Sequence, residues 1–208
     1  MVAASGSFHP KGFLGAGVGH IATVRIEIRD AVEADLPSVV ELWERLAEHH
    51  EKLSDEFELA WDSKRHWRAY LDKRFAEIST KLIVAEEEGD IVGFMLCMLS
   101  PNVPIFKERK IGIIADVYVL EERRRKGVAR KMLDVAVRWF KKNKVRSVQL
   151  GVAHDNMEGR AVWRSMGFEP YMITKRLDLD KMGSAPQMST VKRLVTTKNV
   201  KRKKVFRR

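Results

Sequence analysis

One basic stretch decides the fold of this chain: Arg124-Arg125-Lys126-Gly127-Val128-Ala129. It follows a strongly apolar run over 111–120 and opens a helical pattern that reaches about Lys142. This order predicts a buried strand, a tight turn and the start of a helix. The first N–H groups of a helix lack intrahelical acceptors and carry partial positive charge, so phosphate is their natural ligand. The small Gly127 and Ala129 allow close approach of the backbone to a ligand, and the neighbouring cations add positive charge.

Spacing separates three kinds of phosphate-binding loop. The P-loop pattern G-x-x-x-x-G-K-[ST] is absent, and the dinucleotide fingerprint needs three glycines where this loop has one. The remaining pattern, R-x-x-G-x-A, resembles the acetyl-CoA loop [RQ]-x-x-G-x-[GA] of the GNAT N-acetyltransferase superfamily. The alternative is a solvated basic turn, because basic residues and glycine begin many helices.

The composition indicates one globular domain with two tails. The 208 residues are 32% charged and 45% hydrophobic. We expect a flexible segment over 1–23, a folded domain over 24–180 and a basic tail over 181–208. The single cysteine, Cys97, lies in an apolar run, which favours a core position and excludes disulfides within one chain. Because no apolar stretch approaches the roughly 18 residues that span a bilayer, we expect a cytoplasmic protein with no membrane partner.

Hydrophobic periodicity predicts an α/β protein with a mixed sheet of six or seven strands and helices on both faces. Asp35 is the expected cap of the first helix, and Asp155 with Glu158 forms a capping box for the last, which Gly167 ends. The expected order is strand 25–29, helices from about 36 and over 63–79, hairpin strands 82–85 and 91–99, strand 111–120, the helix after Gly127, strand 147–152, a last helix, and one or two closing strands over 168–179.

A second signature strengthens the resemblance. Asn156, Gly159, Trp163 and Met166-Gly167-Phe168 resemble the GNAT pattern N-x-x-[AS]-x-x-x-[YF]-x-x-x-G-F on the fourth helix. Together the two signatures extend the resemblance over about 25–179. It implies an acetyl-CoA-dependent N-acetyltransferase in which an amine attacks the thioester directly. No metal is expected, and Cys97 aligns with no nucleophile.

The resemblance also implies which residues hold the cofactor. The diphosphate of acetyl-CoA would bind the backbone N–H groups of the basic loop, and the pantetheine arm would lie along the preceding strand where the sheet splays. An N–H group near Val119 would polarise the thioester carbonyl, and Asn156 would hold the arm from the other side. The cofactor-binding residues expected on this basis are Val117, Tyr118, Val119, Arg124, Arg125, Lys126, Gly127, Val128, Ala129 and Asn156.

Two departures leave the proton-transfer residues open. Many relatives carry an acidic Tyr where this chain has Trp163, and an indole N–H is not an acid near neutral pH. Some polyamine-type relatives place a Glu base where this chain has Ala115. Asp116, the next residue, is therefore a candidate general base or water-orienting group, although strand alternation could turn it away. Tyr118 is a candidate acid, with His154 and Tyr171 as substitutes.

The acceptor is expected to be a cationic small amine or a protein amino group. Eight acidic residues along the first helices form either a solvated helix face or a negative rim that attracts such an acceptor. They are Glu41, Glu44, Glu48, Glu51, Asp55, Glu56, Glu58 and Asp62. His49 and His50 are adjacent, whereas paired helical metal ligands need a spacing near four.

Basicity is concentrated in the tail. Ten of the residues in 181–208 are Lys or Arg and none is acidic, so residues 1–180 carry about +1 of the total charge of +11. The tail is either a solubilising segment or a contact for nucleic acid or the ribosome. A second hypothesis is therefore an acyl-CoA-binding module with little catalysis, anchored through this tail. Either a monomer or a homodimer fits the sequence.

Overall fold

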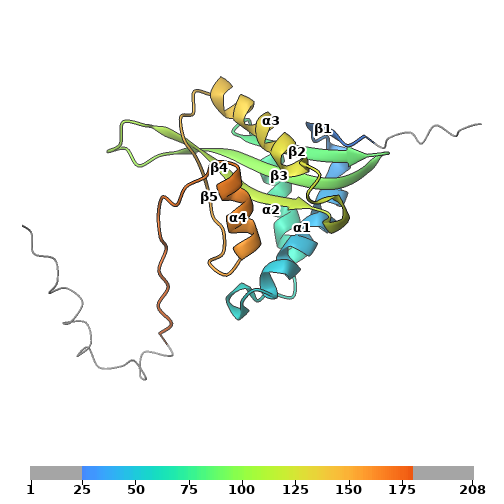
Figure 1. The fold of residues 1–208 in the computed structure, drawn as a ribbon, viewed down its shortest axis with the longest axis horizontal. Helices are drawn as coiled ribbons and strands as arrows, with labels where there is room; N and C mark the ends of the chain where they lie inside the picture. The colour runs from blue at the N-terminus through green and yellow to red at the C-terminus, as the bar shows by residue number, and fades with distance from the viewer. Residues whose placement is uncertain (1–24, 180–208) are drawn as a thin grey trace, which may run out of the picture. The chain divides into compact units, whose positions relative to one another are not determined.

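The computed structural model describes residues 25–179, and its sheet contains five strands in the order β1-β2-β3-β4-β5 (Figure 1). Neighbouring strands from β1 to β4 are antiparallel, and β5 lies parallel to β4. The strands are β1 Glu27–Asp30, β2 Thr80–Glu87, β3 Asp90–Pro101, β4 Lys110–Val119 and β5 Val148–Leu150.

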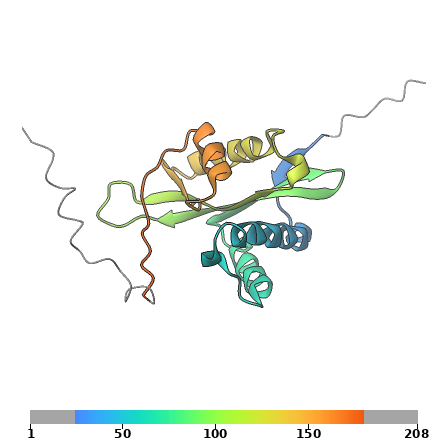
Figure 2. The same cartoon turned by 60° about the horizontal axis from the view of Figure 1, so that its bottom comes forward.

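Four α-helices cover the two faces of the sheet (Figure 2). They are α1 Leu36–Glu51, α2 Ser63–Phe75, α3 Val128–Lys142 and α4 Met157–Ser165. α1 and α2 cover one face, and α3 and α4 cover the other. Three short 3-10 turns, η1 Glu33–Asp35, η2 Asp55–Phe57 and η3 Glu121–Arg123, join these elements. The predicted α/β class, with a mixed sheet and helices on both faces, is confirmed.

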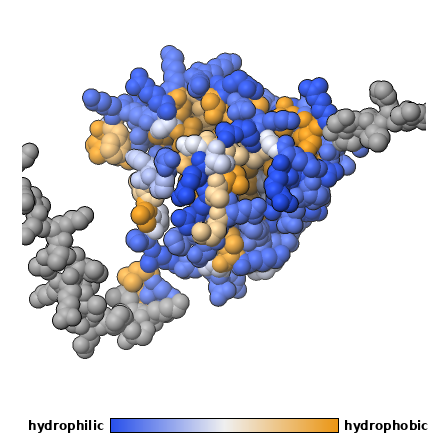
Figure 3. Space-filling view, in the orientation of Figure 1, coloured by the Kyte–Doolittle hydropathy of each residue, from blue (hydrophilic) through white to orange (hydrophobic). Residues whose placement is uncertain are grey.

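The central strand β3 is buried on both faces, which explains its almost continuous apolar sequence. Phe94 and Leu96 belong to the core cluster that packs under α1 and α2. Met95 and Cys97 alternate with them and are also fully buried, on the face that α3 covers. Burial raises the pKa of the Cys97 thiol to about 12, so this cysteine is an unreactive core residue. Polar residues cover much of the outer surface (Figure 3).

The strand count differs from the predicted six or seven. Residues 168–179 form no helix or strand, although their alternating sequence predicted closing strands. A strand requires a hydrogen-bonded neighbour as well as a suitable pattern, and no ladder in the described part of the chain includes this segment. The proline at 170 also lacks the N–H group that a ladder needs. Residues 1–24 and 180–208, which contain the whole of both predicted tails, lie outside the described residues.

Both predicted side-chain caps are corrected. The carboxylate of Asp35 accepts hydrogen bonds from Arg29 at 2.6 and 2.9 Å and from the Val32 N–H group at 2.8 Å, so it does not cap α1. Asn156, and not Asp155, is the N-cap of α4, because its Oδ1 accepts the Gly159 N–H group at 2.7 Å. Gly167 follows α4 with φ +94°, as a helix-ending glycine should. No helix among residues 25–179 is long and apolar enough to cross a membrane.

Candidate active site

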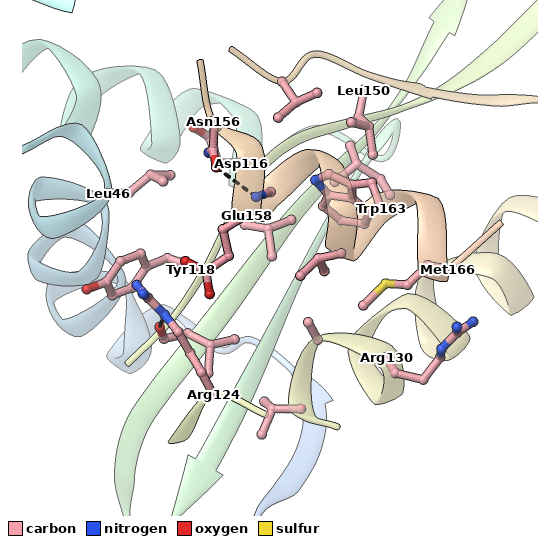
Figure 4. Close-up of a pocket in the computed structure, with 18 of the residues that line it drawn as sticks. Leu46, Asp116, Tyr118, Arg124, Arg130, Leu150, Asn156, Glu158, Trp163 and Met166 are labelled. Carbon is pink, nitrogen blue, oxygen red and sulfur yellow. Dashed lines mark hydrogen bonds between the residues drawn. The ribbon is translucent and has the colours of Figure 1, made fainter. Parts of the chain in front are cut away.

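A gap between β4 and β5 organises the site. The two strands pair only where Gly112, Ile113 and Ile114 meet β5, whereas β3 remains paired with β4 as far as Val119. Residues 115–119 of β4 therefore have an open edge on the β5 side. A cavity of about 410 Å³ lies along this edge, within the range of small-ligand sites. Its walls come from α1, β4, the loop that begins α3, β5 and α4 (Figure 4).

A β-bulge at Ala115 sets the direction of the side chains along the gap. Leu96 pairs with Asp116 and Cys97 pairs with Ile114, so Ala115 is an extra residue in β4. Cross-strand partners share a face, which places Asp116 on the α1 side with Leu96. Tyr118 pairs with Phe94 and lies on the same side. The bulge therefore turns both candidate proton-transfer residues toward α1.

Backbone groups of β4 face the open edge. The Leu120 N–H group donates to the Val92 carbonyl at 2.9 Å, so the polar groups of residue 120 point toward β3. Backbone groups alternate along a strand, and those of Val117 and Val119 therefore point toward the gap. Nε of Arg124 donates to the Val119 carbonyl at 3.0 Å. The Val119 N–H group and both polar groups of Val117 are consequently directed to whatever enters the gap.

The start of α3 presents backbone donors to the same cavity. The first intrahelical bond runs from the Lys131 N–H group to the Gly127 carbonyl, 3.0 Å, so the N–H groups of Gly127, Val128, Ala129 and Arg130 have no intrahelical acceptor. Gly127 has φ +75°, a backbone conformation that is strained for any residue with a side chain. A Cβ atom at this position would nevertheless meet nothing within 4 Å. Glycine is needed at this position for its conformation, and the space beside it is open.

The predicted basic residues have different surroundings. Arg124 and Arg125 line the cavity, whereas Lys126 is exposed and is not part of the lining. The guanidinium of Arg124 lies over the Tyr118 ring, 5.4 Å from its centroid. Arg130 also lines the cavity and donates to the Ser165 carbonyl at 2.8 Å, which ties the start of α3 to the end of α4. The arginines therefore place positive charge in the cavity beside the start of α3, and Arg130 also connects α3 to α4.

Asp116 combines burial with access to the cavity. It lines the cavity beside Tyr118 (Figure 4), and burial raises the pKa of its carboxyl group to about 6. A carboxylate with a pKa near 6 is ionised at neutral pH and is a better proton acceptor than an ordinary aspartate. Tyr118 is only 8% exposed and belongs to the core under α1.

The α4 wall brings the second signature to the cavity. Asn156 and Trp163 both line it, Asn156 from the start of α4 and Trp163 from within the helix (Figure 4). Oδ1 of Asn156 is used to cap α4, which leaves its amide nitrogen as the group that can donate to a ligand. Glu158 comes from the same helix, lines the cavity and was not predicted as a site residue.

α1 contributes residues that were not predicted to belong to the site. Leu46, His49 and His50 line the cavity, and burial lowers the pKa of His50, with a further contribution from His49. Leu46 and His50 continue the helical spacing of the core-facing residues, and this signal could have placed them toward the sheet. The described residues contain no cluster of three or more side chains suited to a metal ion.

The acidic residues of α1 and the following turns do not line the cavity. Several have local partners: Glu44 pairs with Lys64 at 2.7 Å, and Glu51 accepts the Leu59 N–H group at 2.8 Å. This placement favours the solvated-face interpretation over a rim around the cavity. The carboxylates that do line the cavity are Asp116 and Glu158.

Comparisons with known proteins agree with this geometry. The family model described as the acetyltransferase (GNAT) family matches residues 43–168. The chain is 24% identical over 144 residues to YhfO of Bacillus subtilis, described as an uncharacterized N-acetyltransferase, covering 69% of this chain and 90% of that protein. An uncharacterized N-acetyltransferase of Archaeoglobus fulgidus is 28% identical over 140 residues, covering 67% and 90% of the two chains.

A solved structure shows the same fold. The structure of a predicted acetyltransferase from Clostridium acetobutylicum with acetyl-CoA superimposes with a TM-score of 0.64 at 21% identity, covering 76% of this chain and 98% of that one. The family match extends over more than half of the sequence. The chain therefore belongs to the acetyltransferase (GNAT) family and is an acetyltransferase of that family.

Proposed function

We propose that the protein transfers the acetyl group of acetyl-CoA to an amine that attacks the thioester directly. One observation carries the proposal: the cavity reaches from α1 on one face of the sheet, through the gap between β4 and β5, to the first amides of α3. Such a cavity would let donor and acceptor approach from opposite faces and meet beside Asp116. Positioning two reactants in this way removes much of the entropic barrier to their reaction.

On the donor side, the diphosphate would accept hydrogen bonds from the N–H groups at 127–130, with Arg125 supplying charge. The pantetheine arm would run along β4, exchanging hydrogen bonds with the backbone of Val117 as an added strand does. The amide nitrogen of Asn156 would donate to the arm from the α4 side. The Clostridium acetobutylicum structure, which was solved with acetyl-CoA, supports acetyl-CoA as the donor.

On the acceptor side, the carboxylate of Asp116 would remove a proton from the acceptor ammonium, directly or through one water. The nitrogen lone pair then forms the C–N bond at the thioester carbonyl, whose oxygen becomes negative and accepts the Val119 N–H group. Collapse of this intermediate breaks the C–S bond. The second proton lost from the nitrogen neutralises the coenzyme A thiolate. The indole of Trp163 does not donate a proton in this step.

The charges near the reacting atoms favour a cationic acceptor. Asp116 and Glu158 both line the cavity and add negative charge to it, and Asp116 lies on β4, along which the thioester would run. A protonated amine, on a small molecule or on a protein, would be attracted to the carboxylates. The neutral form of His50, favoured by the lowered pKa, avoids repulsion between the imidazole and the ammonium.

The test measures release of coenzyme A from acetyl-CoA in the presence of a panel of amines: polyamines, amino sugars, and peptides with free lysine or N-terminal groups. We expect turnover with at least one cationic amine and formation of its N-acetyl product by mass spectrometry. Calorimetry that detects no affinity for coenzyme A would falsify the proposal. Affinity without turnover of any amine, together with polyanion binding through 181–208, would instead support the acyl-CoA-binding module.

A further inference from the structure

The loop that joins β3 to β4 carries a second surface, separate from the cavity, whose composition suggests a binding function. The ladder between these strands ends at the pair Pro101 and Lys110, and the loop over 102–109 projects beyond it (Figure 1). We call this loop the hairpin tip. It lies at the opposite end of β4 from the loop that begins α3, about 30 Å away at 3.3 Å per residue.

Internal hydrogen bonds hold the hairpin tip in one conformation. The Asn102 N–H group donates to the Arg109 carbonyl at 2.9 Å, and the Asn102 amide nitrogen donates to the Glu108 carbonyl at 2.9 Å. The Phe106 N–H group donates to the Val103 carbonyl at 3.0 Å, and the Arg109 guanidinium donates to the Pro104 carbonyl. None of these hydrogen bonds uses an apolar side chain, so the shape of the loop does not depend on its exposed apolar residues.

Three apolar side chains point into solvent from this ordered loop. Ile105 is 83% exposed, Val103 53% and Phe106 48%. In Figure 3 hydrophobic atoms gather at the left edge, where Figure 1 places the hairpin. A convex tip that exposes several large apolar residues together differs from the single exposed apolar residues that are normal on a protein surface.

Cations surround these apolar side chains. The hairpin contributes Lys107, Arg109 and Lys110, all exposed. The connection from α3 to β5 lies beside the tip, because the Glu108 carboxylate accepts the Ser147 N–H group at 2.9 Å and the Ser147 hydroxyl at 2.8 Å. That connection and the last turn of α3 contribute exposed cations at Lys141, Lys142, Lys144 and Arg146. Glu108 is the sole acidic residue in the two segments 99–112 and 141–149.

We infer that the hairpin tip docks on an anionic lipid bilayer. A convex apolar tip ringed by lysine and arginine matches the interface of such a membrane, where apolar side chains enter the acyl boundary and cations meet the headgroup phosphates. RNA fits less well, because only Phe106 of the three exposed apolar side chains can stack on a base, whereas the aliphatic Val103 and Ile105 can neither stack on bases nor bind their edges. A second copy of this chain would bring like charges together if the tips met.

Docking on a bilayer departs from the sequence-based expectation of no membrane partner, which considered only membrane-spanning segments. Docking through the tip would leave the cavity at the other end of β4 open to coenzyme A. The inference does not depend on the acetyl transfer proposed above, since the two surfaces share no residue.

A fluorescent label on the full-length protein tests the inference. Ile105→Cys would carry an environment-sensitive fluorophore, and labelling would be selective because Cys97 is fully buried. Trp61→Cys is the matched control, since Trp61 is 95% exposed and lies just before α2. We expect a blue shift of the label at 105, and none at 61, on vesicles of phosphatidylglycerol and phosphatidylcholine. Vesicles of phosphatidylcholine alone and a homopolymeric RNA should produce no such shift.

Binding of unlabelled variants gives a second measurement. The double variant Val103→Ser with Ile105→Ser should lower the vesicle partition coefficient about tenfold at high salt, where simple charge attraction is screened. Trp61→Ser should leave it unchanged, and the basic tail is the same in every variant. The inference is overturned if the label at 105 does not shift on anionic vesicles, if both labels shift equally, or if RNA shifts the label at 105 as much as vesicles do.

Discussion

At the scale of single residues, Asp116 links the geometry of the site to its pH dependence. Burial raises the pKa of its carboxyl group from an ordinary 3.8 to about 6. The folded state therefore binds more protons than the unfolded state between these two values, and stability falls as pH rises through this window. Above pH 6 the buried charge destabilises the fold, while the ionised form is the one that can accept a proton.

Asp116→Asn should separate these two effects. We expect kcat/KM of the variant to fall about a hundredfold or more, and the rise of wild-type activity through about pH 6 to disappear. The free energy of unfolding at pH 8 should increase by roughly 1 to 3 kcal/mol, because about two units of raised pKa are removed, and the difference should vanish below about pH 4. Denaturant unfolding and pH–rate profiles measure both. The exposed Asp134→Asn is the control, and a purely structural role for Asp116 would leave the pH–rate profile unchanged.

Gly127 permits an equally direct comparison with another glycine. Gly127 and Gly89 both have positive φ, +75° and +94°, and a Cβ atom at either would meet nothing within 4 Å. Gly127→Leu and Gly89→Leu should therefore lower the free energy of unfolding by a similar amount, about 1 to 2 kcal/mol. Only Gly127→Leu should weaken coenzyme A binding, by tenfold or more in calorimetry, since Gly89 lies in the β2–β3 turn. Equal affinities in the two variants would contradict a diphosphate at the start of α3.

At the scale of elements, Asn156 has two functions that one substitution can separate. Its Oδ1 caps α4 by accepting the Gly159 N–H group, and its amide nitrogen is the proposed donor to the pantetheine arm. Asn156→Asp keeps the acceptor and removes the donor. The free energy of unfolding should therefore change by less than about 0.5 kcal/mol, while KM for acetyl-CoA rises several-fold. Asn156→Ala removes both groups and should also lower stability by about 1 kcal/mol. A normal KM in Asn156→Asp would assign this residue to capping alone.

The elements also show what the sequence could and could not predict. Strongly periodic segments such as α3, and the order of elements up to α4, were predicted correctly because burial imposes their patterns. The bulge at Ala115 was not predictable. An extra residue within a continuous apolar run does not change the hydrophobic pattern of the strand. The strands expected over 168–179 failed for a different reason. Strand pairing depends on a neighbouring edge that no local pattern specifies.

Some residues of the candidate site could likewise be predicted from local sequence motifs, and others could not. The loop that begins α3 was visible as a local motif, because a left-handed turn requires a residue such as Gly127, whereas the cap of α4 was assigned one residue too early, to Asp155 instead of Asn156. His49, His50 and Glu158 reach the cavity through the packing of whole helices against the sheet. Their contribution therefore emerges only in three dimensions, although the spacing of Leu46 and His50 indicated the direction.

At the scale of the whole molecule, the uneven distribution of charge leads to a last prediction. Ten basic and no acidic residues lie within 181–208, so removal of this segment lowers the net charge from +11 to about +1. Among residues 25–179, which the structure describes, those that line the cavity lie between Leu46 and Met166. Deletion should therefore leave kcat/KM for a small amine within about twofold, while binding to heparin or RNA, measured against salt, loses most of its steep salt dependence.

A full-length variant with the ten basic tail residues replaced by glutamine is the matched control, because it changes charge without shortening the chain. It should behave like the deletion in polyanion binding if charge alone is responsible. A large fall in kcat after deletion, with normal activity in the glutamine variant, would assign the tail's length to the acceptor site. Since net charge near zero also reduces colloidal stability, activity must be compared at protein concentrations at which both variants remain monodisperse.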